Sequence, residues 1–235
     1  MFEREIKLIG KNSFEHIQKA SVCVIGLGGV GGHAVETLIR SGIKNIIIVD
    51  YDIVDVTNKN RQIIANDDTI GRKKTEVMKE RILKINSDVN VIIVDRKLDI
   101  DNLDIIFNNK IDYLIDACDT VKVKKELIKQ CINNKIKFIS SMGTGNKLDP
   151  TKLEICDIRD TNYDPLARVI RKFVKDQKIN EKVTVVCSKE IPIKTTGDVS
   201  SIAYVPSVAG ILCASYVIND LIKEVCDKNV SKNSM

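Results

Sequence analysis

Apolar residues along the chain form two kinds of pattern that follow each other in turn. Short continuous apolar runs are typical of strands buried on both faces, and apolar residues three or four positions apart are typical of helices that cover such a sheet. The predicted strands span residues 22–25, 45–49, 90–94, 112–115 and 137–140, and the predicted helices span residues 30–39, 73–86 and 121–133. Because strand and helix alternate, the pattern predicts a parallel, doubly wound sheet.

The order of elements changes after residue 150. Strand-like runs at 153–158 and 183–186 flank a helical pattern at 164–177, and a loop rich in Thr, Gly and Ser leads to a last helix after Pro206. The predicted fold class is therefore α/β. It is a Rossmann-like, doubly wound, mostly parallel sheet with additional antiparallel C-terminal strands and a terminal helix.

A glycine cluster separates the first predicted strand from its helix, in the sequence VCVIGLGGVGGHAVETLIRSG. Gly26, Gly28 and Gly31 form a G-x-G-x-x-G pattern, which suits a tight turn that brings the backbone and the amides of a helix start close to a phosphate. Asp50 ends the second strand, near the ~20-residue offset expected for an acid that binds ribose hydroxyls. The context predicts a nucleotide site, and NAD, FAD and ATP all remain open at this point.

Composition restricts the class of protein. The chain has 235 residues, 43% of them hydrophobic, which is ordinary for a globular core. Its net charge of +5 does not by itself indicate an anionic partner, because Lys, Ile and Asn are frequent throughout the chain. The longest apolar stretch, residues 208–218, is shorter than the ~20 residues of a membrane span, so a buried or dimer-interface helix is expected there. Charged residues near the start argue against a secretory signal, and we expect a cytoplasmic protein. Seven cysteines without a C-x-x-C pair indicate neither a disulfide framework nor a zinc site.

Residues near the glycine loop bear on the choice between a dinucleotide and ATP. The chain has two histidines, His16 before the first strand and His33 on the outer turn of the glycine-loop helix, and neither is placed as a proton relay for hydride transfer. No tyrosine is followed four positions later by lysine, so the proton donor common in short-chain dehydrogenases is absent too. The chain therefore lacks the proton-transfer residues that would support dehydrogenase chemistry.

Cations and a carboxylate instead favour ATP. The segments DYDIVDVTNKNRQ and GRKKTEVM set Asn58, Arg61 and Lys74 just past the second strand, at the crevice where ligands of such sheets bind. A triphosphate needs more positive charge than a glycine loop without a Walker lysine supplies, and Arg61 and Lys74 can provide it. The segment DACDT puts Asp119 past the fourth strand, where a carboxylate beside phosphates would hold Mg²⁺.

These motifs resemble the ThiF/MoeB/HesA superfamily of adenylating enzymes, which is related to the ubiquitin-activating enzymes. Five linked motifs carry the resemblance over nearly the whole chain: GLGGVG, DYDIVDVTNKNRQ, GRKKTEV, DACDT and the N-terminal FEREIKLIG. The resemblance implies a homodimer that uses ATP and Mg²⁺ to adenylate a carboxylate. The implied site comprises the loop glycines Gly26, Gly28, Gly29 and Gly31, Asp50 for the ribose, Asp52 in support, Asn58, Arg61 and Lys74 for the phosphates, Asp119 for Mg²⁺, and Arg4 reaching into the neighbouring subunit's site.

Three further segments narrow the resemblance. DPLARVIRKF, SKEIPIK and YVPSVAGILCASYVINDLI are similar to the tRNA threonylcarbamoyladenosine dehydratases, which close a cyclic form of the modified adenosine beside the anticodon. MoeB-type and ThiF-type members usually carry two zinc-binding C-x-x-C pairs, and this chain has none. The resemblance implies tRNA as the partner of a single adenylation domain. Its nucleotide-binding half is expected at about 1–149, its substrate and dimer elements at about 150–226, and a frayed tail at 227–235.

Several alternatives stay open from the sequence. The substrate could instead be the C-terminal glycine of a ubiquitin-like sulfur carrier, and whether a sulfur-transfer partner exists is open. A different kind of function is also possible, namely an NAD-binding module without ATP chemistry. Cys187 could form a thioester, although a core thiol is favoured, and Asp119 could cap the helix at 121–133. Four basic residues at helical spacing could track an RNA backbone or form a solvated face. They are Arg168, Arg171, Lys172 and Lys175, opposite Leu166, Val169, Ile170 and Phe173.

Overall fold

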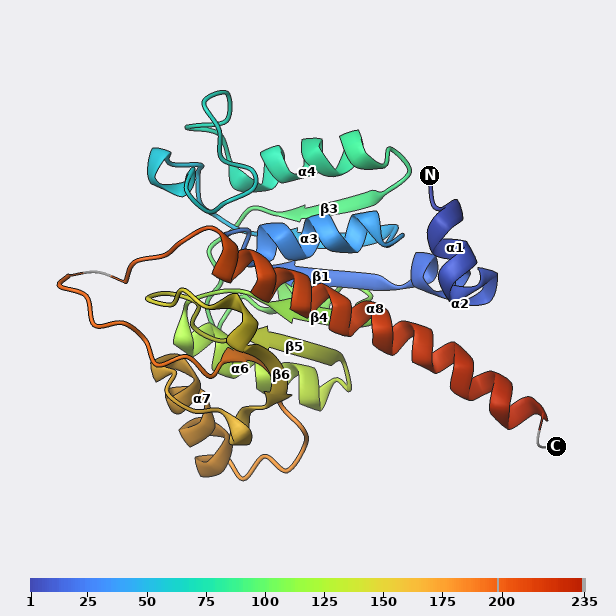
Figure 1. Cartoon of the computed structure of the whole chain (residues 1–235). Helices are drawn as coiled ribbons and strands as arrows, with labels where there is room; N and C mark the ends of the chain where they lie inside the picture. Colours follow the sequence, from blue (N-terminus) through green and yellow to red (C-terminus); the bar gives the residue numbers. More distant parts are fainter. Residues whose placement is uncertain (198, 234–235) are drawn as a thin grey trace.

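A single sheet forms the centre of the molecule. The computed structural model describes residues 1–197 and 199–233, and within them seven strands pair in the order β3-β2-β1-β4-β5-β7-β6 (Figure 1). The strands are β1 (Ser21–Ile25), β2 (Asn45–Val49), β3 (Asn90–Val94), β4 (Tyr113–Asp116), β5 (Lys137–Ser141), β6 (Leu153–Asp157) and β7 (Thr184–Ser188). Neighbouring strands pair in parallel, apart from β6, which runs antiparallel to β7. The predicted mostly parallel sheet is confirmed. Of the two C-terminal strands expected to be antiparallel, β6 is antiparallel to its neighbour β7, whereas β7 also extends the parallel sheet beside β5.

Helices cover both faces of the sheet. They are α1 (Glu3–Ile9), α2 (Lys11–Lys19), α3 (Gly31–Arg40), α4 (Lys74–Ile85), α5 (Asp104–Phe107), α6 (Val121–Asn133), α7 (Pro165–Asp176) and α8 (Tyr204–Asn233). One core joins the sheet to α2, α3, α4 and α8, and a second joins the opposite face to α5 and α6. A third core lies between α6, α7 and β7. The crossover helices of a parallel sheet necessarily bury both of its faces in this way.

The strand β1 shows how the sequence produces these layers. Val22 and Val24 belong to the core under α3 and α8, while Cys23 and Ile25 belong to the core under α6. Successive side chains of a strand point to opposite faces, so a strand buried on both faces has no polar alternation. The continuous apolar run that predicted β1 is the consequence of this double burial.

The terminal helix α8 is longer than the sequence pattern suggested. A 24-residue stretch, Tyr204–Asp227, is long and apolar enough to cross a membrane by length and composition, and 50% of its most apolar window is buried within the protein. The expectation that residues 208–218 are too short for such a span is therefore wrong for the helix as a whole. The buried side packs on α3, where a Cβ at Gly210 would lie 2.2 Å from the carbonyl oxygen of Val30. This face serves as a core element of the fold.

Two regions differ from the pattern-based assignment. The first 20 residues contain α1 and α2, and His16 of α2 places Nε2 2.8 Å from Glu224 Oε2 of α8. The short helix α5 was also not predicted, because four residues are too few to establish a helical period. Helix α8 continues to Asn233 through most of the predicted frayed tail, and residues 234–235 of that tail lie outside the described residues.

The predicted two-faced character of α7 is partly wrong. Its buried residues are Ala167, Ile170 and Val174. Arg171 follows Ala167 by four positions, so it lies beside this buried stripe, and its guanidinium donates to the carbonyl and the hydroxyl of Thr161, each at 2.6 Å. Val169, which was expected on the apolar face, is 40% exposed. The other three basic residues of the predicted face are exposed.

Candidate active site

A cavity of about 330 Å³ opens at the carboxyl ends of β1, β2 and β4. The strand order reverses between β1 and β4, and such switch points are where open α/β sheets bind ligands. The structure brings most of the predicted site residues together around this cavity. Those that line it are Gly26, Gly28, Gly29, Asp50, Asp52, Asn58, Arg61, Lys74 and Asp119. Gly31 and Arg4 do not line it.

Two glycines give the loop its shape. Gly26 has φ +87°, and a Cβ there would lie 2.8 Å from the carbonyl oxygen of Ala117. A Cβ on Gly31 would lie 1.7 Å from the carbonyl oxygen of Gly26, so any side chain would push the helix start away from the loop. Gly31 therefore packs the loop against α3, while Gly28 and Gly29 form the wall of the cavity. The N-cap residue Val30 supplies no side-chain cap, which leaves the amides of this helix start suited to an anion.

Asp50 fixes the glycine loop to the end of β2. Its Oδ2 accepts a 2.6 Å hydrogen bond from the amide of Leu27, and its Oδ1 accepts one of 2.9 Å from the amide of Asp52. Each carboxylate oxygen can accept a second hydrogen bond, so both remain available to ribose hydroxyls. Asp50 thus has a structural role in the turn in addition to the predicted ribose contact.

Lys74 is a buried cation with one carboxylate partner. It begins α4, its side chain is 7% exposed, and Nζ lies 2.9 Å from Asp52 Oδ2. The backbone amide of Lys74 also donates to the carbonyl of Asp52. Asp52 is 46% exposed in its side chain, so this pair leaves the ammonium at the cavity wall with room for further acceptors. A lysine ammonium has three donors, which is suited to several phosphate oxygens.

Asn58 and Arg61 are held by a short helical turn after Asp55. The amide of Asp55 donates to Asn58 Oδ1 at 3.1 Å while Asp55 Oδ1 accepts from the amide of Thr57, which is a capping box. Arg61 Nη1 donates to the carbonyl of Thr57 at 3.0 Å and to Asn60 Oδ1 at 2.8 Å. A guanidinium has five N–H donors, so these two bonds orient Arg61 and leave other donors for a ligand.

The cavity also contains three residues that the sequence pattern missed. Gln62 is 7% exposed, and its Oε1 has no hydrogen-bond partner in the part of the chain that the structure describes. Arg96 is an exposed cation just past the end of β3, and Tyr51 lies under the ammonium of Lys97, which is 5.4 Å from its ring centroid. Arg96 could have been found by the rule that selected Asp50, because parallel strands end at the same edge. Gln62 gave no such signal, since an amide beside an arginine is common on surfaces.

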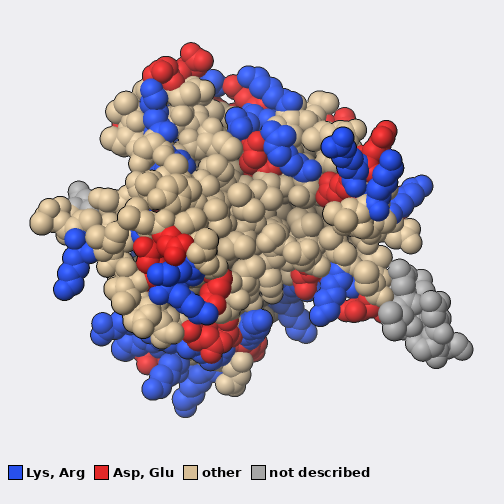
Figure 2. Space-filling view, in the orientation of Figure 1, with Lys and Arg blue, Asp and Glu red and all other residues tan. Residues whose placement is uncertain are grey.

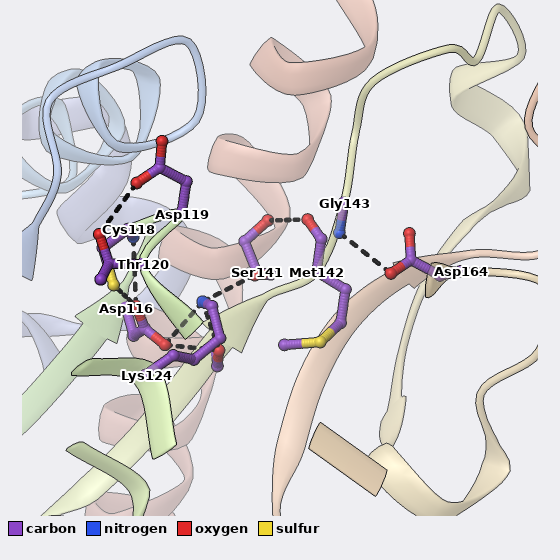
Figure 3. A network of polar contacts seen from close by, with 10 residues as sticks. Asp116, Cys118, Asp119, Thr120, Lys124, Ser141, Met142, Gly143 and Asp164 are labelled. Atoms are coloured by element: carbon purple, nitrogen blue, oxygen red, sulfur yellow. Dashed lines mark hydrogen bonds and ion pairs between the residues drawn. The ribbon is translucent and has the colours of Figure 1, made fainter. Parts of the chain in front are cut away.

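Asp119 lies on a turn that a buried ion pair supports. Lys124 Nζ lies 2.7 Å from Asp116 Oδ2, and their side chains are 0% and 2% exposed. The other oxygen of Asp116 accepts hydrogen bonds from the amide and the thiol of Cys118, next to Asp119 (Figure 3). Burial by itself lowers the pKa of Lys124, but the attraction of Asp116 outweighs it and the pKa is raised. Lys124 therefore stays charged and holds the Asp116–Asp119 turn against β5 through Ser140.

Carboxylates gather at the mouth of the cavity, where a cation could be shared with the phosphates of a nucleotide. Asp119 is exposed there. The negative charge of this group is seen in the pKa of Tyr51, which is raised by Asp52 first, then by burial and by Asp119 and Asp50. No group of three or more His, Cys, Asp or Glu side chains suited to a metal occurs among residues 1–197 and 199–233. Mg²⁺ commonly uses one or two carboxylates and completes its shell with phosphates and water. The alternative in which Asp119 caps α6 does not hold, because Thr120 is the N-cap of that helix.

The remaining sequence candidates lie away from this cavity. Burial lowers the pKa of His33, whose Nε2 lies 2.9 Å from Ser207 Oγ of α8, so it links two helices. Burial raises the pKa of Cys187 to about 12, which is typical of an inert core thiol. Arg4 is exposed on α1. This helix lies near the start of β1, away from the strand ends that hold the cavity (Figure 1).

Comparison with known proteins gives consistent matches. The family model described as ThiF family matches residues 2–235. The tRNA threonylcarbamoyladenosine dehydratase of Bacillus subtilis (strain 168) is 40% identical, with 97% of this chain and 97% of the relative covered. Among solved structures, E. coli TcdA in complex with ATP has a TM-score of 0.91 and 33% identity, covering 96% of this chain and 95% of that chain. TcdA in complex with AMP has a TM-score of 0.89 and 34% identity, covering 94% of each.

Proposed function

The chain belongs to the ThiF family, and we propose that it is a tRNA threonylcarbamoyladenosine dehydratase. It would use ATP to adenylate the carboxylate of the modified adenosine and then close that group into a ring. The observation that carries the proposal is the cavity at the strand ends, which gathers a glycine loop, the cations Arg61, Lys74 and Arg96, and the exposed carboxylate of Asp119. The 40% identity with a named dehydratase along nearly its whole length supports the choice of substrate.

The chemistry begins with activation of a poor electrophile. A carboxylate repels nucleophiles and has no leaving group. One of its oxygens attacks the α-phosphorus of ATP, and the bond to the departing pyrophosphate breaks. Arg61 and Lys74 would stabilise the charge that builds on the phosphates, and the amides of Gly28 and Gly29 would position them. Asp50 would hold the ribose through oxygens that already fix the turn.

Ring closure then removes one molecule of water in two parts. The carbamoyl group of the same nucleoside attacks the activated carbonyl carbon, and the bond to AMP breaks. AMP leaves with the original carboxylate oxygen, and the attacking group loses a proton. Because both reacting groups belong to one molecule, their effective molarity is high and no covalent enzyme intermediate is needed. The buried thiol of Cys187 is consistent with this route.

Mg²⁺ would be held by Asp119 together with phosphate oxygens of ATP. When bound, it supplies positive charge that screens the phosphates and favours departure of pyrophosphate. The residues of this chain then have separate tasks. Asp116 and Lys124 keep the turn that carries Asp119 in place, and Asp52 keeps Lys74 at the cavity wall.

Assembly and location complete the proposal. A C₂ homodimer is proposed in which Arg4 of one subunit completes the site of the other, since Arg4 does not line the cavity of its own chain. The protein is proposed to act in the cytoplasm, where its tRNA substrate is found. The second candidate function is adenylation of the C-terminal glycine of a ubiquitin-like sulfur carrier, which the absence of zinc-binding C-x-x-C pairs disfavours.

The site assignment can be tested by pyrophosphate release with threonylcarbamoyl-modified tRNA present. Asp119→Ala, Arg61→Ala and Lys74→Ala are each expected to lower the rate by about 10²-fold or more, because each removes transition-state charge stabilisation. Lys79→Ala is the matched control, since Lys79 is exposed on the same helix as Lys74 and does not line the cavity. Thermal melting verifies that each variant folds. Wild-type rates in all three site variants would refute the assignment.

A further inference from the structure

A second cavity of about 770 Å³ lies along α7, facing α6. We call it the α6–α7 groove, and its lining includes Lys125 of α6 and Tyr163, Arg168 and Lys172 from the turn before α7 and from α7 itself. It shares no lining residue with the candidate active site. The ATP chemistry described above therefore leaves this groove without a role.

Basic side chains dominate the surface around the groove. Figure 2 shows Lys and Arg gathered over the part of the molecule where Figure 1 places α7. The basic residues on these two helices that reach the surface include Lys122, Lys125, Lys129, Arg168, Lys172 and Lys175. The ion pair of Lys172 with Asp176 is exposed, so water and a polyanion can compete for it. Arg168 is exposed and has no ion-pair partner in the described part of the chain. The surface therefore has cations to offer to phosphates.

Aromatic rings accompany these cations. Tyr163 is 62% exposed and lines the groove. Its φ of +58° is in the left-handed region, which bulky residues rarely occupy, and the adjoining hydrogen bond from the amide of Asp164 to the carbonyl of Asn162 is 2.7 Å long. The ring of Phe173 carries the ammonium groups of two lysines at 5.6 Å from its centroid. An exposed ring beside cations is the combination that binds an unpaired base and its phosphates.

A buried polar contact fixes the groove to the sheet. Asp164 lines the groove and caps α7 by accepting from the amide of Ala167 at 2.7 Å. It also pairs with Lys147 at 2.7 Å, both side chains being 1% exposed, and it accepts a long hydrogen bond from the amide of Gly143, just past β5 (Figure 3). The start of α7 is thereby held in a fixed place relative to the edge of the sheet that carries the active site.

The two sites lie on different sides of helix α6. Thr120 and Val123, at its start, line the active-site cavity, whereas Lys125 lines the groove. An α-helix with its side chains is about 10–12 Å across, so the groove begins roughly one helix diameter from the active-site cavity. A nucleotide chain laid along the groove can therefore keep one of its bases within reach of the active site.

We propose that the α6–α7 groove binds the RNA backbone next to the reacting nucleotide, with Arg168, Lys172 and Lys125 on phosphates and Tyr163 stacked on an unpaired base. This rests on the proposed function, because it identifies the contact surface of the same tRNA substrate. It also revises the basic stripe predicted from the sequence. Arg171 of that stripe lines the groove but is tied to Thr161, and Lys175 does not line it. Lys125 and Tyr163 line the groove from outside the stripe.

The test measures binding of threonylcarbamoyl-modified tRNA without ATP, by fluorescence anisotropy, at several salt concentrations. Arg168→Glu/Lys172→Glu should weaken binding by about tenfold or more and reduce the slope of log affinity against log salt by about 2, one for each lost phosphate contact. Arg168→Gln/Lys172→Gln should act in the same direction if the charge-reversed protein does not fold. Tyr163→Ala should weaken binding with the slope unchanged, and Tyr163→Phe should bind as the wild type does.

The matched control is Lys79→Glu/Lys84→Glu, which makes the same change of charge on exposed residues of α4. It should leave tRNA affinity within about threefold of wild type, and ATP affinity should be unchanged in both double variants. The proposal is overturned if the groove variants bind tRNA as the control does, or if the wild type binds no tRNA at low salt. A groove built for an acidic protein segment would bind polyglutamate and leave tRNA affinity unaffected by the charge reversal, which also overturns it. The proposed function is judged separately, by whether the wild type dehydrates this tRNA.

Discussion

The buried pair of Lys124 and Asp116 permits a quantitative prediction about stability. In Lys124→Met the side chain keeps a similar length, but Asp116 loses the ammonium at 2.7 Å in a site where the two side chains are 0% and 2% exposed. Removing one partner of a buried pair costs about 3–5 kcal/mol, because an uncompensated charge remains in the core. Lys124 also donates to Ser140 and to the carbonyl of Ser141, so these acceptors lose a partner too. For a chain of this size, 1 kcal/mol lowers Tm by about 2–4 °C, so a fall of about 6–20 °C is expected.

A double-mutant cycle isolates the pair from the hydrogen bonds around it. Asp116→Asn/Lys124→Met removes both charges and should be less destabilised than the sum of the single variants by about 1–3 kcal/mol. Urea denaturation measures the free energies of unfolding, and differential scanning fluorimetry measures Tm. Lys122→Met is the control, since this lysine is exposed on the same helix and should change stability by less than about 0.5 kcal/mol. A loss below about 1 kcal/mol in Lys124→Met, or single-variant losses that simply add, would show that the buried pair does not stabilise the fold in this way.

Three further predictions concern other parts of the chain. Burial raises the pKa of Cys187 to about 12, so this thiol is expected to be inert. Cys187→Ala should retain activity within about twofold, and a thiol reagent should leave Cys187 of the native protein unmodified. Loss of activity in Cys187→Ala would instead support a thioester intermediate on this cysteine. Burial raises the pKa of Asp220, but the hydrogen bonds that it accepts from Lys137 and then Tyr113 outweigh burial, so its pKa lies below the ordinary 3.8. The carboxylate therefore adds to the free energy of unfolding above pH 3.8, and this contribution is lost as the pH falls through the lowered pKa. The free energy of unfolding of Asp220→Asn should therefore fall less steeply than that of the wild type below about pH 5. An equally steep fall in both proteins would show that Asp220 does not contribute in this way. Mixed Arg4→Ala and Lys74→Ala chains should regain activity that neither has alone, because one hybrid site contains both cations. No recovery after verified subunit exchange would argue against a shared site.

The sheet was predictable because double burial produces a signal that needs no knowledge of the partner elements. The apolar runs at 45–49 and 90–94 coincide with β2 and β3 as the structure has them. The glycine loop and Asp50 were equally predictable, since the turn restricts which residues can occupy it. These features depend on local chemistry and on the rule that parallel strands end at one edge.

Other features depend on contacts between distant segments and gave no local signal. The partner of Lys124 is eight residues away, but the full burial of this lysine also involves β5, where its ammonium donates to Ser140 and to the carbonyl of Ser141. Gln62 becomes notable only because the fold buries its amide at the cavity. The inward turn of Arg171 depends on Thr161, which lies in a loop that the helical period of α7 does not describe. Arg96 was within reach of the sequence, because it lies two positions past the end of β3, at the sheet edge where Asp50 follows β2.

Mass spectrometry of the product shows whether this chain dehydrates threonylcarbamoyladenosine in tRNA. The purified protein is incubated with tRNA carrying this nucleoside, ATP and Mg²⁺, with Asp119→Ala as the inactive control, and the tRNA is digested to nucleosides. The wild-type reaction is expected to give a nucleoside lighter by one water, together with an equal amount of AMP, and the control is expected to give neither. An unchanged nucleoside, with ATP binding demonstrated in the same preparation, would show that the chain is not this dehydratase and would favour adenylation of a ubiquitin-like sulfur carrier instead.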